Sequence, residues 1–335
     1  MLDKQKVTIQ DIADKANVSP STVSRVLSGN ARVVEAKQTA VLAAIRELNY
    51  RPNIFARGLA SGQSMTIGVL TQNISSPIYD AIMWGILQNL KGSGYSPIFA
   101  DGYWSQEAEQ NALHILLDRH VDGLIVIGGS SPIEVLVQTA KQVPLIVVGR
   151  DIAEISNNCL KMDDFQGGYV ATQHLINKGH RDIAHITGIL SHDDAVERLE
   201  GYKKALKEAG IPVDDQLIVE GSFMEQSGVM AINILMERGR AFSAIFAAND
   251  QMAFGARLAL YHKGIRVPDD VSIIGYDNQP ASAYMTPPLT TIDQPAVELG
   301  EAASHNILQL IKGQAIEKTT FPAKIVIRES VSRLR

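Results

Sequence analysis

From residue 65 onward the chain alternates short apolar runs with amphipathic stretches. Seven runs rich in β-branched residues end in small or polar residues, at 67–70, 97–101, 123–129, 145–150, 183–188, 244–250 and 271–277. Continuous apolar runs of this length are typical of parallel strands that are buried on both faces. The stretches between them, such as 79–95 and 166–180, have helical periodicity and reach a glycine near their ends. Alternating strands and helices predict a doubly wound α/β fold.

The rhythm of strands and helices restarts after Met162, which predicts two similar lobes with a cleft between them. Ligands of open α/β sheets bind beyond the carboxyl ends of the strands. Arg150, Asn249 and Asp277 each end one of the apolar runs, so they are candidate cleft residues.

The residues before Met65 predict short helices only. Thr8 and Asp11 fit a capping box, and a second helix begins with Ser19 as N-cap and Pro20 at its first position. A third helix is expected over roughly residues 34–49. Two short helices around a tight turn indicate a helix-turn-helix, whose second helix can enter a major groove. A plain three-helix cap packed on the body is the alternative.

The exposed side chains of the second helix suit DNA. Pro20 and Ser21 lie at its tip, and Thr22 and Arg25 can reach phosphate or base.

The segment 51–64 predicts a hinge helix or linker. Asn53 can cap a helix of about two turns, which is marginal by itself in water and could order on DNA. Leu59 would then be an apolar wedge in a minor groove, with Arg51 and Arg57 on phosphates. An ordinary linker with a buried leucine is the alternative.

Composition and charge narrow the class of protein. The 335 residues contain one cysteine, Cys159, and no apolar run at the N-terminus, which predicts a cytoplasmic protein without disulfide, signal peptide or membrane span. Residues 1–64 carry nine Lys and Arg against five Asp and Glu, whereas the remainder carries 22 against 31. This asymmetry indicates a polyanion-binding head on an acidic body.

An enzyme is not expected. The sequence has neither nucleotide-binding glycine motif and no G-x-S-x-G nucleophile elbow, and its eight histidines are scattered. No cofactor or metal site is therefore predicted. A solute-binding protein with the same body is a second alternative, but it would need export and has no use for a basic head.

Motifs along nearly the whole chain resemble the lactose-repressor/galactose-repressor family of bacterial transcription regulators. They are TIQDIADKANVSPSTVSRVLSGN, ELNYRPN, ARGLASGQS, GYKKALKEAGI, FSAIFAANDQMAFGA, GIRVPDDVSIIGYDN and LTTIDQP, in the family's order and spacing. The resemblance implies a helix-turn-helix head at 1–50, a hinge at 51–64 and a periplasmic-binding-protein-like effector and dimerisation domain at 65–335. The N-lobe would comprise about 65–161 and 293–322, and the C-lobe about 162–292 and 323–335.

The resemblance also implies site residues in both parts. The DNA-binding set is Thr8, Pro20, Ser21, Thr22, Ser24, Arg25, Asn30, Asn53, Arg57 and Leu59. The effector-binding set is Arg198, Asn249, Asp277, Gln294 and Phe223, with Tyr79, Arg150 and Asp163 on the cleft rim. Arginine, amide and carboxylate groups suit vicinal hydroxyls, and an aromatic ring suits the apolar face of a sugar.

Structural roles for three of these residues remain open. Arg198 could pair with Glu197 or Asp194, Asp277 could cap a turn, and Phe223 could belong to the core.

The predicted function is sequence-specific repression of sugar-utilisation genes. A homodimer would bind a palindromic operator in double-stranded DNA and be released by a small sugar-type effector in the cleft; a corepressor-dependent regulator is the alternative. A galactoside, a glucoside and a pentose all fit the residues. The sequence SHDDAVERLEGY (191–202) leans towards the galactose-repressor side.

Overall fold

The computed structural model describes residues 7–27, 33–50, 63–316, 319 and 321–334. The chain divides into two compact units, and the boundary lies between Ser64 and Met65. Asn30, Asn53, Arg57 and Leu59 lie outside the described residues.

Within the described residues the first unit has three helices, α1 (Ile9–Ala16), α2 (Pro20–Leu27) and α3 (Glu35–Glu47). The capping box at α1 is confirmed, because Asp11 N donates to Thr8 Oγ1 at 3.3 Å and Thr8 N donates to the Asp11 carboxylate at 2.7 Å. Asn17 makes the turn before α2 with a left-handed backbone. One buried residue from each helix, Ile12, Val23 and Val41, meets in a small core. These contacts confirm the predicted three-helix arrangement.

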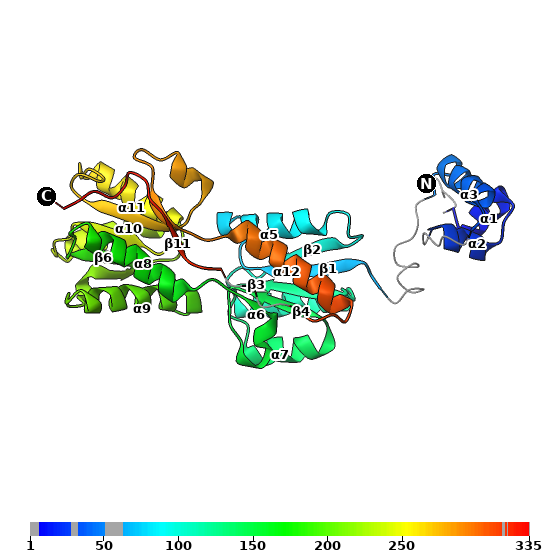
Figure 1. Ribbon diagram of the computed structural model, residues 1–335, viewed down its shortest axis with the longest axis horizontal. Helices are drawn as coiled ribbons and strands as arrows, with labels where there is room; N and C mark the ends of the chain where they lie inside the picture. The colour runs from blue at the N-terminus through cyan, green and yellow to red at the C-terminus, as the bar shows by residue number, and fades with distance from the viewer. Residues whose placement is uncertain (1–6, 28–32, 51–62, 317–318, 320, 335) are drawn as a thin grey trace. The chain divides into compact units, whose positions relative to one another are not determined.

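The first lobe of the second unit is a five-stranded parallel sheet in the order β2-β1-β3-β4-β5. Its strands are β1 (Thr66–Thr71), β2 (Ser96–Asp101), β3 (Gly123–Ile127), β4 (Leu145–Val148) and β5 (Cys159–Leu160). Its helices are α5 (Pro77–Leu90), α6 (Gln106–Asp118), α7 (Ile133–Gln142) and α12 (Ala296–Ile311), with a 3-10 turn η1 (Ala153–Asn158). Helices cover both faces of the sheet (Figure 1), which explains the continuous apolar runs.

The second lobe is a six-stranded sheet in the order β11-β10-β9-β8-β6-β7, in which only the β10–β11 pair is antiparallel. Its strands are β6 (Ile183–Thr187), β7 (Ile218–Glu220), β8 (Ala244–Ala247), β9 (Ser272–Asp277), β10 (Thr290–Asp293) and β11 (Lys324–Val326). Its helices are α8 (Asp164–Asn177), α9 (Asp193–Glu208), α10 (Glu225–Glu237) and α11 (Asp250–His262), with 3-10 turns η2 (Asp215–Leu217) and η3 (Pro280–Ala283).

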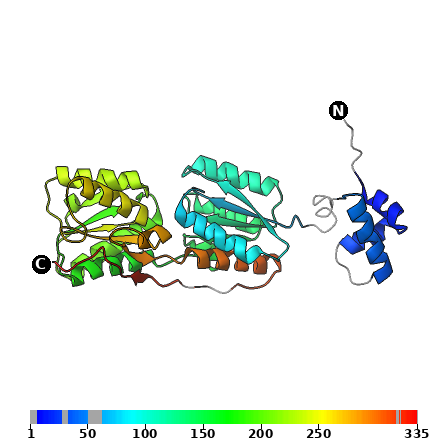
Figure 2. The same ribbon diagram turned by 90° about the horizontal axis from the view of Figure 1, so that it is seen from above.

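The chain passes between the two lobes three times, after β5, after β10 and before β11 (Figures 1 and 2). All seven predicted strands are confirmed, but β5, β7, β10 and β11 were not predicted. β5, β7 and β11 have only two or three residues, and β10 (TTID) has a single apolar residue, so none of them forms a long apolar run. In the described part of the chain no helix is long and apolar enough to cross a membrane.

Three helix pairs pack so closely that their backbones touch at glycine. A Cβ atom on either partner of each pair would collide with main-chain atoms of the other helix. The pairs are Gly85 with Gly300 (α5 and α12), Gly168 with Gly201 (α8 and α9) and Gly228 with Gly255 (α10 and α11). These crossings fix each helix pair as a rigid layer over its sheet.

We expect Gly300→Ala to destabilise the protein by about 1–3 kcal/mol, because its new methyl group would meet the carbonyl oxygen of Ile82. Urea unfolding measures the change in the free energy of unfolding. Glu301→Ala on the exposed side of α12 is the control, with an expected change within about 0.5 kcal/mol. Equal stability of both variants would contradict the close packing.

Candidate functional site

A pocket lies between the two lobes, where strands of both sheets end. It is lined by residues at or after the ends of β1 to β5 in the first sheet and of β6 to β10 in the second. Seven of the eight predicted cleft residues line it: Tyr79, Arg150, Arg198, Phe223, Asn249, Asp277 and Gln294. The fold therefore brings these distant parts of the sequence together at one place.

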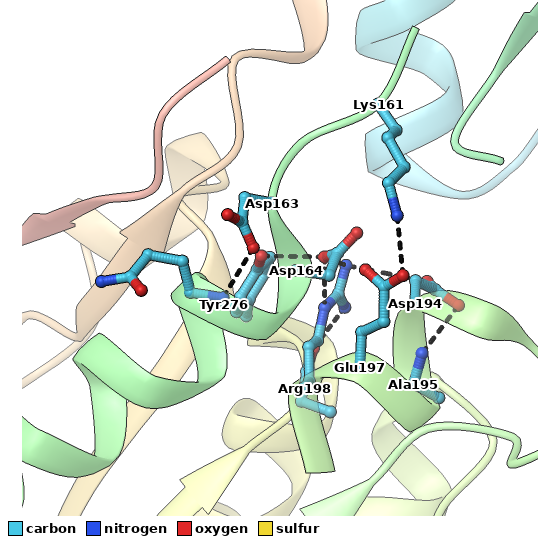
Figure 3. A network of polar contacts seen from close by, with 10 residues as sticks. Lys161, Asp163, Asp164, Asp194, Ala195, Glu197, Arg198 and Tyr276 are labelled. Carbon is cyan, nitrogen blue, oxygen red and sulfur yellow. Dashed lines mark hydrogen bonds and ion pairs between the residues drawn. The ribbon is translucent and has the colours of Figure 1, made fainter. Parts of the chain in front are cut away.

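Arg198 on α9 is buried, with 3% of its surface exposed. Its Nε donates to Asp164 Oδ1 at 2.9 Å, its Nη2 lies 2.8 Å from the same oxygen, and its Nη1 donates to the carbonyl oxygen of Ala248 at 2.7 Å (Figure 3). Its guanidinium carbon also lies 3.8 Å from the centre of the Tyr276 ring, whose hydroxyl donates to Asp164. The arginine is thus held in place before any ligand binds.

The partners of Arg198 differ from those considered from the sequence. Asp164 is its main partner, while Asp194 lies 3.6 Å away and half-exposed. Glu197 instead accepts from Lys161 at 2.7 Å, and this contact joins α9 to the segment after β5. The sequence could not show the Arg198–Asp164 pair, because 34 positions separate the two residues.

Asp163 does not line the pocket. Helix α8 begins at Asp164, and the exposed Asp163 is its N-cap, with a carboxylate that accepts from Gln166 N at 2.8 Å. The N-cap side chain of Asp163 turns back to the end of α8, whereas the next residue, Asp164, lines the pocket. An effector contact of Asp163 stays a prediction.

Asp277 offers the pocket a buried carboxylate at the end of β9. Its hydrogen-bond partner is the side-chain amide of Gln279, at a long 3.3 Å. Burial raises the pKa of Asp277, and the nearby Arg198 opposes that rise. Its backbone has φ 111°, a conformation that a residue with a side chain rarely adopts. Such strain is typical of functional sites.

Two amides complete the polar wall of the pocket. Asn249 is the N-cap of α11: its Oδ1 accepts from Met252 N and its Nδ2 donates to the carbonyl oxygen of Phe223, both at 2.9 Å. It therefore has a structural role and retains one amide hydrogen for a ligand. Gln294 has a buried Oε1 with no partner in the described structure. The pocket thus presents acceptors that a hydroxyl group could satisfy.

Several pocket residues were missed from the sequence. Trp104, His192, Asp194 and Lys161 line the pocket together with Asp164. Trp104 lies three residues beyond the end of β2, so the rule that selected residues at the ends of the apolar runs did not reach it. Lys161 directly follows β5, a two-residue strand that was not predicted, and the others lie before or within helices, where no strand end marks them.

Five of the predicted DNA-contacting residues lie along one short helix, α2. Pro20, Ser21, Ser24 and Arg25 are exposed on α2, and Thr22 is half-buried. The Ser19 hydroxyl lies 2.8 Å from that of Ser21 and 2.9 Å from that of Thr22, which orders the hydroxyls at the start of the helix. Thr8 caps α1.

No group of three or more His, Cys, Asp or Glu side chains that could hold a metal ion occurs among the residues that the structure describes. The acceptors and cations of the pocket suit a polar organic ligand.

Comparison with known proteins shows to which family the chain belongs. Residues 8–53 match the model of bacterial regulatory proteins of the lacI family, and residues 64–329 match the model of periplasmic binding proteins and the sugar-binding domain of the LacI family. The ribose operon repressor of Haemophilus influenzae is 36% identical over 330 residues, which cover 98% of this chain and 99% of that protein. The chain belongs to the LacI family. It is a DNA-binding transcription regulator and not an enzyme.

Solved structures of family members have the same architecture. The Lac repressor dimer bound to operator and the anti-inducer ONPF has a TM-score of 0.89 and 32% identity, covering 98% of this chain and all of that chain. A LacI-family regulator from Enterococcus faecium with bound ribose has a TM-score of 0.73 and 32% identity, covering 81% of this chain and all of that chain. The helix-turn-helix head and two-lobed body predicted from the sequence are confirmed.

Two neighbouring substitutions should separate the roles of the paired aspartates. Asp164→Ala leaves the buried Arg198 charge without its main partner, so we expect a loss of about 3–5 kcal/mol in the free energy of unfolding. Asp163→Ala removes a helix cap and should cost about 1 kcal/mol. Chemical denaturation measures both, and a larger loss for Asp163→Ala would contradict the assignment.

Proposed function

We propose that this regulator is a repressor of sugar-utilisation genes that a small neutral sugar releases from its operator. The observation that carries the proposal is a pocket between two lobes that offers the unpartnered Gln294 Oε1 and the Asp277 carboxylate beside aromatic rings. The named relatives support it: one is a ribose operon repressor, and one similar structure holds ribose. A cytoplasmic location follows from the proposed binding to genomic DNA.

The head would read DNA through α2. Pro20 and Ser21 would meet base edges, and Thr22, Ser24 and Arg25 would position the helix on the backbone and bases. Pro20 has no N–H group, so base choice there would depend on van der Waals contact or on its neighbours. Thr8, Asn30, Asn53 and Arg57 complete the proposed contacts, and Leu59 would be a wedge at the operator centre.

The charges of the pocket favour a neutral effector. Arg198 is already paired with Asp164, and Lys161 is paired with Glu197. Asp193, Asp194 and Asp277 add further carboxylates, whereas Arg150 donates to the carbonyl oxygen of Ser131. The excess of carboxylates would repel a phosphate group. A sugar hydroxyl, in contrast, could donate to Asp277 or Gln294 and accept from Arg198 or Asn249. Tyr79 and Arg150 would contact the effector at the rim of the pocket.

We infer that repression works through the angle between the lobes. The pocket is built from both lobes, so a ligand that fits one arrangement better shifts the equilibrium towards it. A coupling of roughly 1–3 kcal/mol is typical of such switches and would suffice to change DNA affinity.

An apolar surface on the second lobe supports a homodimer. Leu258 and Tyr261 on α11 are 50% and 76% exposed, and Tyr284 after η3 is 87% exposed. Leu258, Tyr261 and Met285 line one shallow hollow. Exposed apolar side chains gathered in this way mark interaction surfaces. The similar Lac repressor is a dimer, which favours a second copy of this chain as the occupant.

We expect Tyr261→Arg to weaken the dimer and lower operator affinity at least tenfold, while sugar affinity stays unchanged. Sedimentation velocity and operator titration measure the two effects. Ile115→Arg, on α6 of the other lobe and also exposed, is the matched control. A dimeric Tyr261→Arg protein would show that this surface is not the interface.

The function is tested by fluorescence anisotropy of a labelled palindrome from upstream of the gene, at fixed salt. We expect tight, salt-dependent binding that one neutral monosaccharide reverses. Leu59→Ala should weaken operator binding and leave sugar binding nearly unchanged, since it alters only the proposed wedge. Binding that appears only with a sugar would indicate corepression. Absence of operator binding at low salt would reject the repressor.

A further inference from the structure

Trp104 reaches across the pocket from one lobe to the other. It lies in the loop between β2 and α6 of the first lobe, and its ring faces two rings of the second lobe. The ring centres of Trp104 and Phe223 are 6.4 Å apart with 16° between the planes, and His192 lies 4.9 Å from Trp104. Tyr79 contacts the tryptophan at 5.6 Å from its own lobe. The pocket therefore has an aromatic wall made by both lobes.

Both facing rings are held by unusual backbone. Trp104 and Phe223 have φ values of 55° and 62°, in the left-handed region that is costly for bulky residues. The Phe223 ring lies so close to Gly188 that a Cβ atom there would collide with it. The neighbouring Tyr103 shares the left-handed backbone but is 75% exposed, whereas Trp104 turns into the pocket. The two rings are thus placed facing each other by constraints within each lobe.

The two aromatic rings lie nearly parallel and face each other, an arrangement that suits a thin, ring-shaped ligand between them. A ring between two aromatic faces needs roughly 7–8 Å between them, or two carbon–carbon contacts of 3.5–4.0 Å. The present separation of the ring centres is 6.4 Å, so the lobes would have to open before a sugar ring could enter. Its hydroxyls would then lie near Asp277 and Gln294, the acceptors described above.

We propose that Trp104 is an effector-contacting residue, which with Phe223 forms an aromatic slot for the ring of a neutral sugar. The inference rests on the proposed function and adds a residue to its site. Because the slot has one side on each lobe, a ring that enters it sets the separation of the lobes. Ligand identity and lobe angle are then linked at the Trp104 side chain.

The chain contains two tryptophans, so Trp84→Phe leaves Trp104 as the sole tryptophan. Trp84 is 55% exposed on α5, away from the lining of the pocket. In this variant D-ribose, D-galactose, D-glucose and D-xylose are titrated while tryptophan emission is recorded. The sugar that releases the operator should change the emission saturably, with the same midpoint as the release.

Substitution of Trp104 in the otherwise unchanged protein tests the contact itself. Trp104→Ala should raise the Kd for that sugar at least tenfold, and Trp104→Phe should restore most of the affinity. Sugar-free operator affinity should stay within twofold of the parent in both. Tyr103→Ala, which alters the same loop but not the pocket, should change the sugar Kd less than twofold.

Two results would overturn the slot in different ways. Operator release by a sugar with constant Trp104 emission, or with an unchanged Kd in Trp104→Ala, would remove Trp104 from the site and leave the proposed function intact. If none of the four sugars changes operator binding or emission, the proposed response to a neutral monosaccharide is wrong. The aromatic slot, which rests on that response, is then wrong as well.

Discussion

The buried charge of Arg198 is the constraint around which the pocket is built. A guanidinium group out of contact with water must be paired and hydrogen-bonded, or the fold loses several kcal/mol. Asp164 supplies the pairing at the first residue of α8, Ala248 supplies a carbonyl oxygen after β8, and Tyr276 on β9 supplies a ring face. Three separate segments are thereby fixed to α9 at the floor of the pocket. The second lobe consequently presents a preorganised surface to a ligand.

Hydrogen bonds also join the end of β9 to the segments that connect the two lobes. Asn278, next to the pocket residue Asp277, donates to Asp293 at the end of β10 and accepts from Arg328 after β11, both at 2.7 Å. Met162 and Phe321, on two of the three connections, form a parallel bridge. The end of β9 is thus hydrogen-bonded to residues that flank two of the connections between the lobes. This continuity gives a physical route by which a ligand with different affinities for two arrangements could select one of them.

How far the sequence predicts this structure depends on the length of each signal. Runs of four or more apolar residues identified the long strands, and the strand-end rule identified Arg150, Asn249 and Asp277. Short strands carry no periodic signal, and pairs distant along the chain, such as Arg198 with Asp164, exist only after folding. The sequence likewise did not single out Asp164, whose role as the partner of Arg198 appears only in the folded structure.

Backbone strain in the body is concentrated where the two lobes meet. Trp104, Phe223 and Asp277 each have a positive φ and all line the pocket, whereas the helix pairs around the sheets are locked by glycine contacts. A strained residue persists only when its surroundings determine it, so rigid helix layers are what allow these three side chains to be held in position. They supply the facing rings and the buried Asp277 carboxylate of the pocket. The local departures from ordinary backbone preference thus coincide with the proposed binding groups, as expected where function rather than folding selects the conformation.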